Sequence, residues 1–170
     1  AGQLVQALQV SSIAAVQVRL NMVDRGAAKD LLNICRERGI TLVAWGALAD
    51  GLLTGKFASN TRFSSNDHRS RMSEFKGDAF LEYIRCMESL NQLAGSMGRK
   101  ASQIALRWVL DYASFTCSLF GAKTDIQVLE NLAADGWCLT REEIAEIDSI
   151  AGKCASAMSK SARQLDGEYL

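Results

Sequence analysis

The order of strand-like and helical segments constrains the fold of this chain more than any other feature. Residues 16–20 alternate like a half-buried strand, and 40–45 and 115–120 are apolar runs of strand length. A continuous run such as 40–45 suits a strand that is covered on both faces. Helical spacing appears between and after these runs, at residues 4–8, 27–38, 80–97, 102–112, 125–134 and 140–150. This alternation predicts an α/β fold with about three parallel strands and covering helices.

Capping signals mark the ends of several predicted helices. Gly39 follows a helix whose last turn is basic, which is typical of a helix C-terminus. Ser102 is expected to cap the helix that it begins. Thr140 and Glu143 form a capping box, so we expect a last helix to begin there and to end near Ile150.

The chain length and the pattern near the C-terminus predict a single domain with a tail. A chain of 170 residues is long enough for one domain with a hydrophobic core. Residues 56–78 are polar and without periodicity, so they predict an irregular loop within that domain. We expect the folded domain over residues 1–152 and a tail over 153–170, either an arm or a disordered end.

Charge and apolar content exclude some classes of function. The chain has 19 basic and 19 acidic residues, so no basic excess indicates binding to nucleic acid. It has no run of about 18 apolar residues, so we expect no membrane span. Ala1 is followed by neither a basic region nor a signal-peptide core, which indicates an interior start of a longer chain or a processed end.

Cysteine and histidine content bears on the compartment and on metal binding. The five cysteines are far apart, odd in number and without a CxxC motif, which favours free thiols in a reducing compartment. We expect the cytoplasm, or an organelle if Ala1 is a processed end. His68 is the single histidine and lies in a polar loop, so no metal site is predicted.

Residues 121–131 form the segment best suited to binding a ligand. A strand-like run ends at a glycine, and a short polar turn with Lys123 leads into a helix. The first turn of a helix presents backbone N–H groups and a positive dipole end, and both favour an anion. Gln127, Glu130 and Asn131 fall on one face of that helix. The segment therefore predicts a phosphate or nucleotide site.

Three parallel strands do not form a complete domain by themselves. Such a sheet leaves two bare edges and an apolar face. We expect a partner to cover them, either a missing part of the same fold, a second copy in a homo-oligomer, or a larger protein assembly.

Several segments resemble aldo-keto reductases, and they occur in the order that the family has them. The resemblance covers about residues 3–152. The segments are 16–18 (sixth strand), 45–57 (after the seventh strand), 66–71 (a loop motif), 102–110 (seventh helix), 121–131 (after the eighth strand) and 139–150 (last helix). The resemblance implies the C-terminal part of a (β/α)8 TIM barrel, incomplete as a barrel, with a site at the carboxyl ends of its strands.

The resemblance also implies an NADP cofactor, held in an extended conformation without a Rossmann glycine fingerprint. Gln17 and Trp45 match positions that flank the nicotinamide, where a flat ring can stack. Arg69 matches a cofactor-clamping arginine, and Lys123 favours NADP over NAD through its charge. The other matched positions are Leu48, Gly51 and Lys56 beside the pyrophosphate, and Gly121, Gln127, Glu130 and Asn131 near the 2′-phosphate and adenine.

The same residues also have structural interpretations that need no ligand. Trp45 can be a core residue at a strand end, and Arg69 can be a solvated surface charge. Glu130 is electrostatically favourable near a helix start without any cofactor. On the residues alone, both interpretations stay open.

Two departures from the family pattern limit the expected activity. The family's catalytic Asp, Tyr, Lys and His come from its first four strands, so no residue here is assigned a catalytic role. Gly46 stands where the family usually has serine, and the chain has no proline to stiffen its loops. We expect the chain to be the NADPH-binding half of an enzyme that transfers hydride between NADPH and a carbonyl or alcohol. By itself, this half is expected to be inactive. The alternative is a non-catalytic structural or regulatory subunit that retains the fold.

Overall fold

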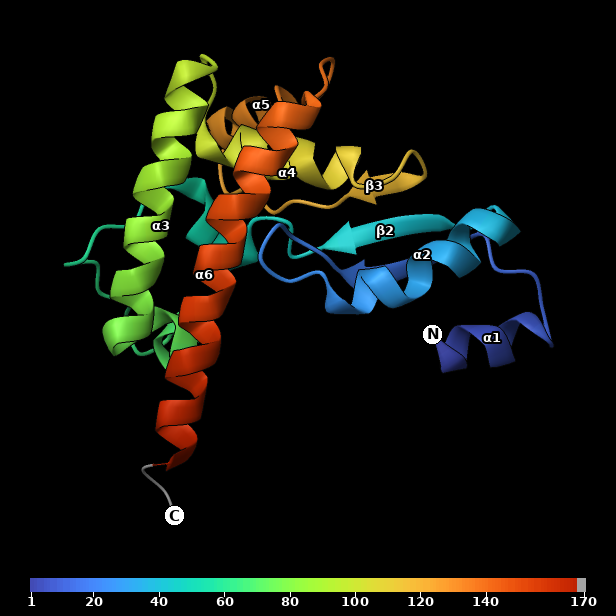
Figure 1. The fold of residues 1–170 in the computed structure, drawn as a ribbon, viewed down its shortest axis with the longest axis horizontal. Helices are drawn as coiled ribbons and strands as arrows, with labels where there is room; N and C mark the ends of the chain where they lie inside the picture. Colours follow the sequence, from blue (N-terminus) through green and yellow to red (C-terminus); the bar gives the residue numbers. More distant parts are fainter. Residues whose placement is uncertain (168–170) are drawn as a thin grey trace.

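A three-stranded parallel sheet lies at the centre of the computed structural model, which describes residues 1–167, with side chains over 1–155. The strands run in the order β1 (Ala15–Arg19), β2 (Thr41–Trp45) and β3 (Thr116–Ser118), as Figure 1 shows. Leu42 pairs in register with one residue of β1 and one of β3. The predicted α/β fold with three parallel strands is confirmed.

Helices make up both connections between the strands. The described elements are α1 (Gly2–Leu8), α2 (Gly26–Arg38), α3 (Gly77–Ser96), α4 (Ala101–Asp111), α5 (Asp125–Leu132), α6 (Arg141–Gly167), and the 3₁₀ helices η1 (Ala49–Thr54), η2 (His68–Arg71) and η3 (Ser73–Phe75). The chain passes from β1 through α2 to β2, and from β2 through η1, α3 and α4 to β3. Parallel neighbours require crossovers of this kind.

Helix α2 illustrates how the sequence sets the bounds of an element. Ala28, Leu31 and Cys35 recur on one helical face, and all three are buried. Gly39 then takes a left-handed conformation with φ of +65°, and its N–H bonds to the Cys35 carbonyl. Glycine adopts this conformation without the clash that a Cβ brings. The predicted helix end at Gly39 is confirmed.

One face of the sheet is covered by helices and the other is bare. Val18, Leu42 and Ala44 point to the covered face and are at most 7% exposed. Burying one such leucine contributes roughly 1.5–3 kcal/mol. Gln17 and Trp45 point to the opposite face and are exposed, because successive side chains of a strand alternate between faces. Over the described residues, β1 and β3 leave free edges, as expected. The bare face carries both polar and apolar side chains, so it is not the uniformly apolar face that was expected.

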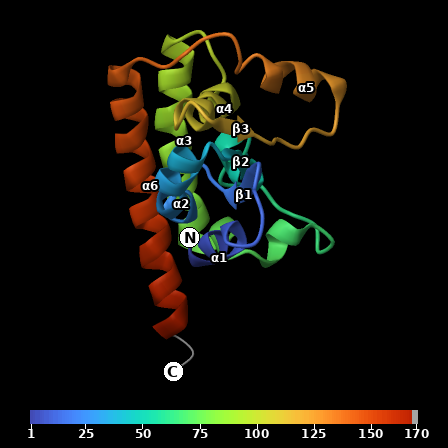
Figure 2. The same ribbon diagram turned by 90° about the vertical axis from the view of Figure 1, so that its right-hand side faces the viewer.

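Helices α3 and α6 lie side by side in both views (Figures 1 and 2). The expected helix end near Ile150 is wrong, because α6 continues to Gly167. The residues that follow Ile150 include alanine, lysine and methionine, which favour helix, and no proline interrupts them. Ala151 and Cys154 are buried. The division at residue 152 stays a prediction, and residues 168–170 of the expected tail lie outside the described residues.

The start of α4 differs from the expected one. The helix begins at Ala101, and Gln103 Oε1 accepts a 2.9 Å hydrogen bond from the Lys100 backbone N–H. Ser102 lies within the helix and is buried. The expected cap at Ser102 is therefore wrong. The side chain that bonds to the backbone N–H before the helix belongs to Gln103, the residue after Ser102.

The segment over residues 56–78 is better ordered than its sequence suggests. It contains η2 and η3, and three of its phenylalanines pack edge-on or tilted against one another and against a fourth in α3, with ring centroids 5.1–6.3 Å apart. These are Phe57, Phe63, Phe75 and Phe80. Aromatic pairs in such geometries are worth about 0.5–1.5 kcal/mol beyond the area that they bury. The expectation of a wholly irregular loop is wrong, since this cluster gives it a small core.

Within residues 1–167, no helix combines the length and the apolar character that crossing a bilayer requires.

Candidate functional site

A cleft of about 1170 Å³ opens where the chain leaves the carboxyl ends of β2 and β3. Its walls come from the β2–η1 turn, the loop around η2, the start of α4, and the β3–α5 connection. It is lined by Trp45, Leu48, Gly51, Lys56, Arg69, Gly121, Lys123, Gln127, Glu130 and Asn131, which are all of the predicted site residues except one. The exception is Gln17, which lies in mid-strand opposite Val43 on the bare sheet face.

A smaller cavity of about 330 Å³ lies on the other side of Asp50. Arg19, Asn21 and Tyr83 are among its lining residues, and it is bounded by α3 and α6. The larger cleft contains the sequence-predicted residues and the polar loop ends, so it is the better candidate for binding a cofactor.

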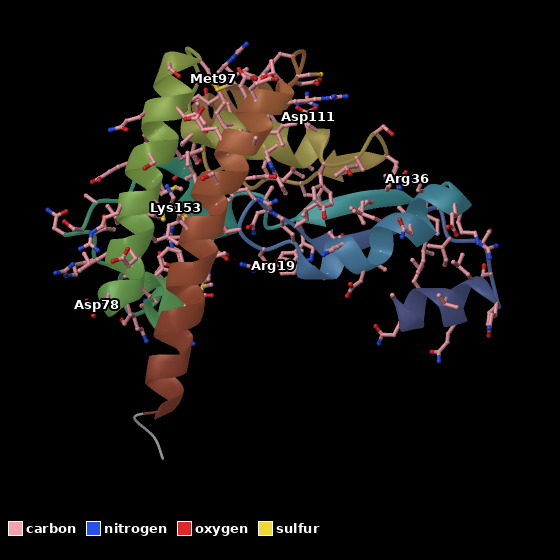
Figure 3. All side chains as sticks on the ribbon, viewed as in Figure 1. Arg19, Arg36, Asp78, Met97, Asp111 and Lys153 are labelled. Carbon is pink, nitrogen blue, oxygen red and sulfur yellow. The ribbon has the colours of Figure 1, made fainter. Side chains whose placement is uncertain are left out.

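Trp45 presents its ring at the mouth of the cleft. The residue is 41% exposed at the carboxyl end of β2. The Arg19 guanidinium carbon lies 5.3 Å from the ring centroid, a cation–π contact on one face. Arg19, labelled in Figure 3, is also paired with Asp24 at 3.1 Å and with Asp50 at 3.5 Å.

The first three residues of η1 all have positive φ angles. The φ angles are +46° at Ala49, +55° at Asp50 and +96° at Gly51. A residue other than glycine in this region costs about 1–3 kcal/mol and persists only where its surroundings fix it. Backbone hydrogen bonds of 2.9 Å, from Ala49 to Gly46 and from Gly51 to Leu48, do so here. Strain of this kind concentrates at ligand sites, and here it falls at the start of η1, where Asp50 and Gly51 line the cleft.

Arg69 is fixed from several sides. Its Nε donates to Asp67 Oδ1 at 2.9 Å, and its guanidinium carbon lies 4.7 Å from the Phe63 ring centroid and 5.5 Å from that of Phe57. The side-chain hydrogen bonds from Arg69 hold the pKa of Asp67 well below its usual range, against the opposing effect of burial. Arg69 is therefore pre-organised, and a carboxylate neutralises much of its charge.

Three cations from separate segments face the same region. The pKa of Lys56 is lowered, first by burial and then by the charges of Arg69 and Lys123, while Asp67 opposes the shift. A lysine whose charged form is disfavoured in this way is stabilised when an anion lies beside it. The arrangement can hold a phosphate.

The start of α5 is less open than expected. Thr124 Oγ1 caps the helix by accepting from the Gln127 N–H at 3.2 Å, and Gln127 Oε1 accepts from the Lys123 N–H at 2.8 Å. Asp125 Oδ1 accepts from the Ile126 N–H at 2.9 Å. The expectation of free N–H groups here is therefore wrong for these three donors, which the chain's own side chains satisfy.

Glu130 and Asn131 both line the cleft, but they differ in burial and in their contacts. The Glu130 carboxylate pairs with the Lys100 ammonium, and Gln103 donates to the Glu130 carbonyl at 3.0 Å. Asn131 is 7% exposed. The Glu130 carboxylate is thus already paired with a side chain of the protein itself.

Sequence reasoning missed several residues that line the cleft, among them Lys100, Asp50 and His68. His68 Nε2 lies 3.3 Å from Asp50 Oδ1, and this contact joins two walls of the cleft. No local pattern places Lys100 beside Glu130, since 30 residues separate them. For Asp50, the glycine that follows it was the only sequence signal of an unusual turn.

The Aldo/keto reductase family profile matches residues 1–152, and the chain belongs to this family. It is 29% identical to the aldo-keto reductase YhdN of Bacillus subtilis over 142 residues, which cover 83% of this chain and 43% of that protein. The chain spans less than half the length of the curated relatives it matches.

Solved structures agree with this assignment. The glycerol dehydrogenase AKR11B4 from Gluconobacter oxydans superimposes with a TM-score of 0.84 at 34% identity, over 89% of this chain and 46% of that one. An aldo-keto reductase from Klebsiella pneumoniae, solved in complex with NADPH, has a TM-score of 0.56 at 23% identity and supports the fold, over 81% and 39% of the two chains. The three open strands with their helices are thus a partial (β/α)8 barrel.

Proposed function

We propose that this chain is the NADPH-binding half of an aldo-keto reductase barrel. The observation that carries the proposal is the convergence of Lys56, Arg69 and Lys123 on one cleft, where burial and the two other cations disfavour the charged form of Lys56. A nucleotide with several phosphates supplies the missing negative charge. Aldo-keto reductases generally bind NADP(H), and the chain belongs to that family.

The residues present fit the two ends of such a cofactor. Trp45 offers an exposed ring face for the nicotinamide, and Lys123 offers a charge for the 2′-phosphate. A Cβ added at Gly51 would meet side-chain atoms of Phe57 and Lys56 at 3.4–3.5 Å, and the φ of +96° favours glycine at this position beside the proposed pyrophosphate. When bound, the nicotinamide supplies the hydride, and this chain contributes binding and orientation.

The chemistry of proton transfer must come from outside this chain under this proposal. Family catalytic residues lie on the strands that precede those described, so we expect no turnover by the 170-residue chain. The partner that completes the site is an N-terminal barrel half, which would extend the free edges of β1 and β3.

Titration with NADPH, followed by its fluorescence, tests the proposal directly. We expect saturable binding that Lys123→Glu weakens about 10- to 100-fold, because one charge-assisted contact is worth about 1.5–3 kcal/mol. Lys29→Glu on the exposed surface of α2 makes the same charge change away from the cleft and should leave binding unchanged. Equal losses in both variants, or NADH binding as tight as NADPH, would contradict a 2′-phosphate contact at Lys123.

A non-catalytic structural or regulatory subunit is the second candidate. It is favoured by the contacts that already occupy the site, namely Asp67 on Arg69 and Lys100 on Glu130, and by the absent hydroxyl at Gly46. Undetectable NADPH binding, together with stable association with other proteins, would support this candidate over the first.

We further propose a reducing compartment for the chain. All five cysteines are free, and two of them, Cys117 and Cys138, are exposed. Exposed thiols of this kind persist where glutathione and thioredoxin keep them reduced. Recovery of the native protein with its thiols oxidised would contradict this assignment.

A further inference from the structure

Arg19 and Trp45 are neighbours across the carboxyl ends of β1 and β2. The two residues are register partners in this parallel pair, so their side chains leave the same, bare face of the sheet. The Leu20 N–H donates to the Trp45 carbonyl at 3.1 Å, which joins the two strand ends. The Arg19 guanidinium carbon lies over the Trp45 ring, 5.3 Å from its centroid. Tryptophan is the ring that binds a cation best in such a contact.

Arg19 is held in this place by groups from neighbouring segments. Its Nε donates to Asp24 Oδ2 at 3.1 Å, and its Nη2 lies 3.5 Å from Asp50 Oδ2. Its side chain also passes close to Gly46, where an added Cβ would meet Arg19 atoms at 3.5–3.9 Å. The guanidinium is therefore restrained over the ring before any ligand arrives.

The two side chains line different hollows of the molecule. Among the described residues, Trp45 lines the larger cleft and not the smaller cavity, whereas Arg19 lines the smaller cavity and not the cleft. The guanidinium thus covers one ring face without forming part of the cleft wall. Two carboxylates already match its charge, so it is poorly suited to binding a phosphate itself.

We propose that Arg19 is a positioning residue, which fixes the Trp45 ring so that its other face can stack on a flat ring in the cleft. This inference rests on the proposed function, in which that flat ring is the nicotinamide. An exposed tryptophan with nothing behind it has rotamer freedom that binding must remove, and restraining the ring beforehand lowers that cost. Arg19 acts only through Trp45 and touches no ligand.

Two ligands separate this role from a general one. NADPH carries the nicotinamide, whereas adenosine 2′,5′-bisphosphate offers the same adenine end and 2′-phosphate without it. We expect Arg19→Met to weaken NADPH binding about 2- to 5-fold in a fluorescence titration, the value of a cation–π contact at an exposed site. Binding of the bisphosphate, measured by calorimetry, should not change. Arg19→Lys keeps a cation and should recover part of the loss.

Arg36→Met is the matched control. Arg36, labelled in Figure 3, lies over the Phe115 ring at 6.0 Å from its centroid, and neither residue lines the cleft. Its loss removes an arginine–aromatic contact elsewhere and should leave both affinities unchanged. In a Trp45→Ala background, Arg19→Met should have no further effect on NADPH, because the two residues act through one contact.

A measurement without ligand checks the ring directly. The near-ultraviolet circular dichroism of Trp45, taken as the difference from Trp45→Phe, depends on how firmly the indole is held. We expect this signal to diminish in Arg19→Met and to persist in Arg36→Met. Far-ultraviolet dichroism of each variant checks that it keeps its helices.

Two results would overturn the proposal. One is an equal loss of NADPH and bisphosphate affinity in Arg19→Met, which would assign Arg19 a general structural role. The other is an effect of Arg19→Met on NADPH that persists undiminished in the Trp45→Ala background. If the unaltered chain binds neither ligand, the proposed cofactor site itself is contradicted. The Trp45 dichroism, which needs no ligand, then still decides whether Arg19 holds the ring.

Discussion

Lys56 is the residue whose environment bears most directly on the proposed ligand. Its pKa lies below 10.5 because burial and two neighbouring cations disfavour its charged form. A bound phosphate favours the charged form and therefore raises this pKa again. Ligand binding at this cleft is consequently coupled to the uptake of a proton wherever Lys56 is partly neutral.

We therefore expect NADPH affinity to fall as pH rises through the Lys56 pKa of the free chain. Lys56→Met removes the titrating group, so it should weaken binding at neutral pH and flatten the alkaline decline. Fluorescence titrations at a series of pH values measure both effects. An alkaline decline of equal size in Lys56→Met would assign it to another group.

Asp67 gives a second prediction at the scale of single residues. Its pKa is depressed in the folded chain, so its contribution to stability is present above 3.8, its ordinary value, and is lost as pH falls through the folded value. Asp67→Asn should lower stability at neutral pH and reduce the additional loss below pH 3.8. Urea unfolding at neutral and acid pH, compared with Asp78→Asn on α3, provides the measurement.

At the scale of elements, the two glycines at the ends of α2 should respond in opposite ways to alanine. Gly39 has φ of +65°, and Gly26 has ordinary helical geometry; neither has an atom within 4 Å of an added Cβ. Gly39→Ala should cost about 1–2 kcal/mol of unfolding free energy through its left-handed backbone. Gly26→Ala should gain about 0.4–1 kcal/mol by restricting the unfolded chain.

Urea unfolding of the two variants separates backbone conformation from packing. A loss at both positions would show that crowding, and not φ, decides the outcome. The comparison needs no ligand, so it stands independently of the proposed function.

Element order and most helix bounds could be predicted because they follow from local patterns. The stop at Gly39 and the capping box at Thr140 are short-range signals, and the structure bears them out. The start of α4 was misplaced because Gln103, one residue beyond Ser102, makes the capping contact. The end of α6 was misplaced because the apolar pattern becomes weak after Ile150, although no proline ends the helix there.

The site was only partly accessible to sequence reasoning. Matched motifs identified most of the residues lining the cleft, since a family's loops keep their order along the chain. Contacts between distant segments, such as Lys100 with Glu130, carry no local signal. The side chains that satisfy the first N–H groups of α5 were likewise hidden, because composition does not reveal rotamers.

At the scale of the whole molecule, the free strand edges and the bare sheet face predict association. We expect the isolated chain to form oligomers or to bind an added N-terminal half of an aldo-keto reductase barrel. Light scattering coupled to size-exclusion chromatography measures the mass of each species. A well-folded monomer that does not bind the added half would contradict the need for a partner.

The common direction of the three strands also sets how many ligands a closed barrel would hold. Every strand ends at the same rim, so a strand added beside β1 or β3 continues a parallel sheet only if it points the same way. Two copies joined around an axis along the strands would place two clefts on one rim, whereas a foreign half would leave a single cleft. Nucleotide stoichiometry per assembled barrel, two or one, therefore reports which partner completes the sheet.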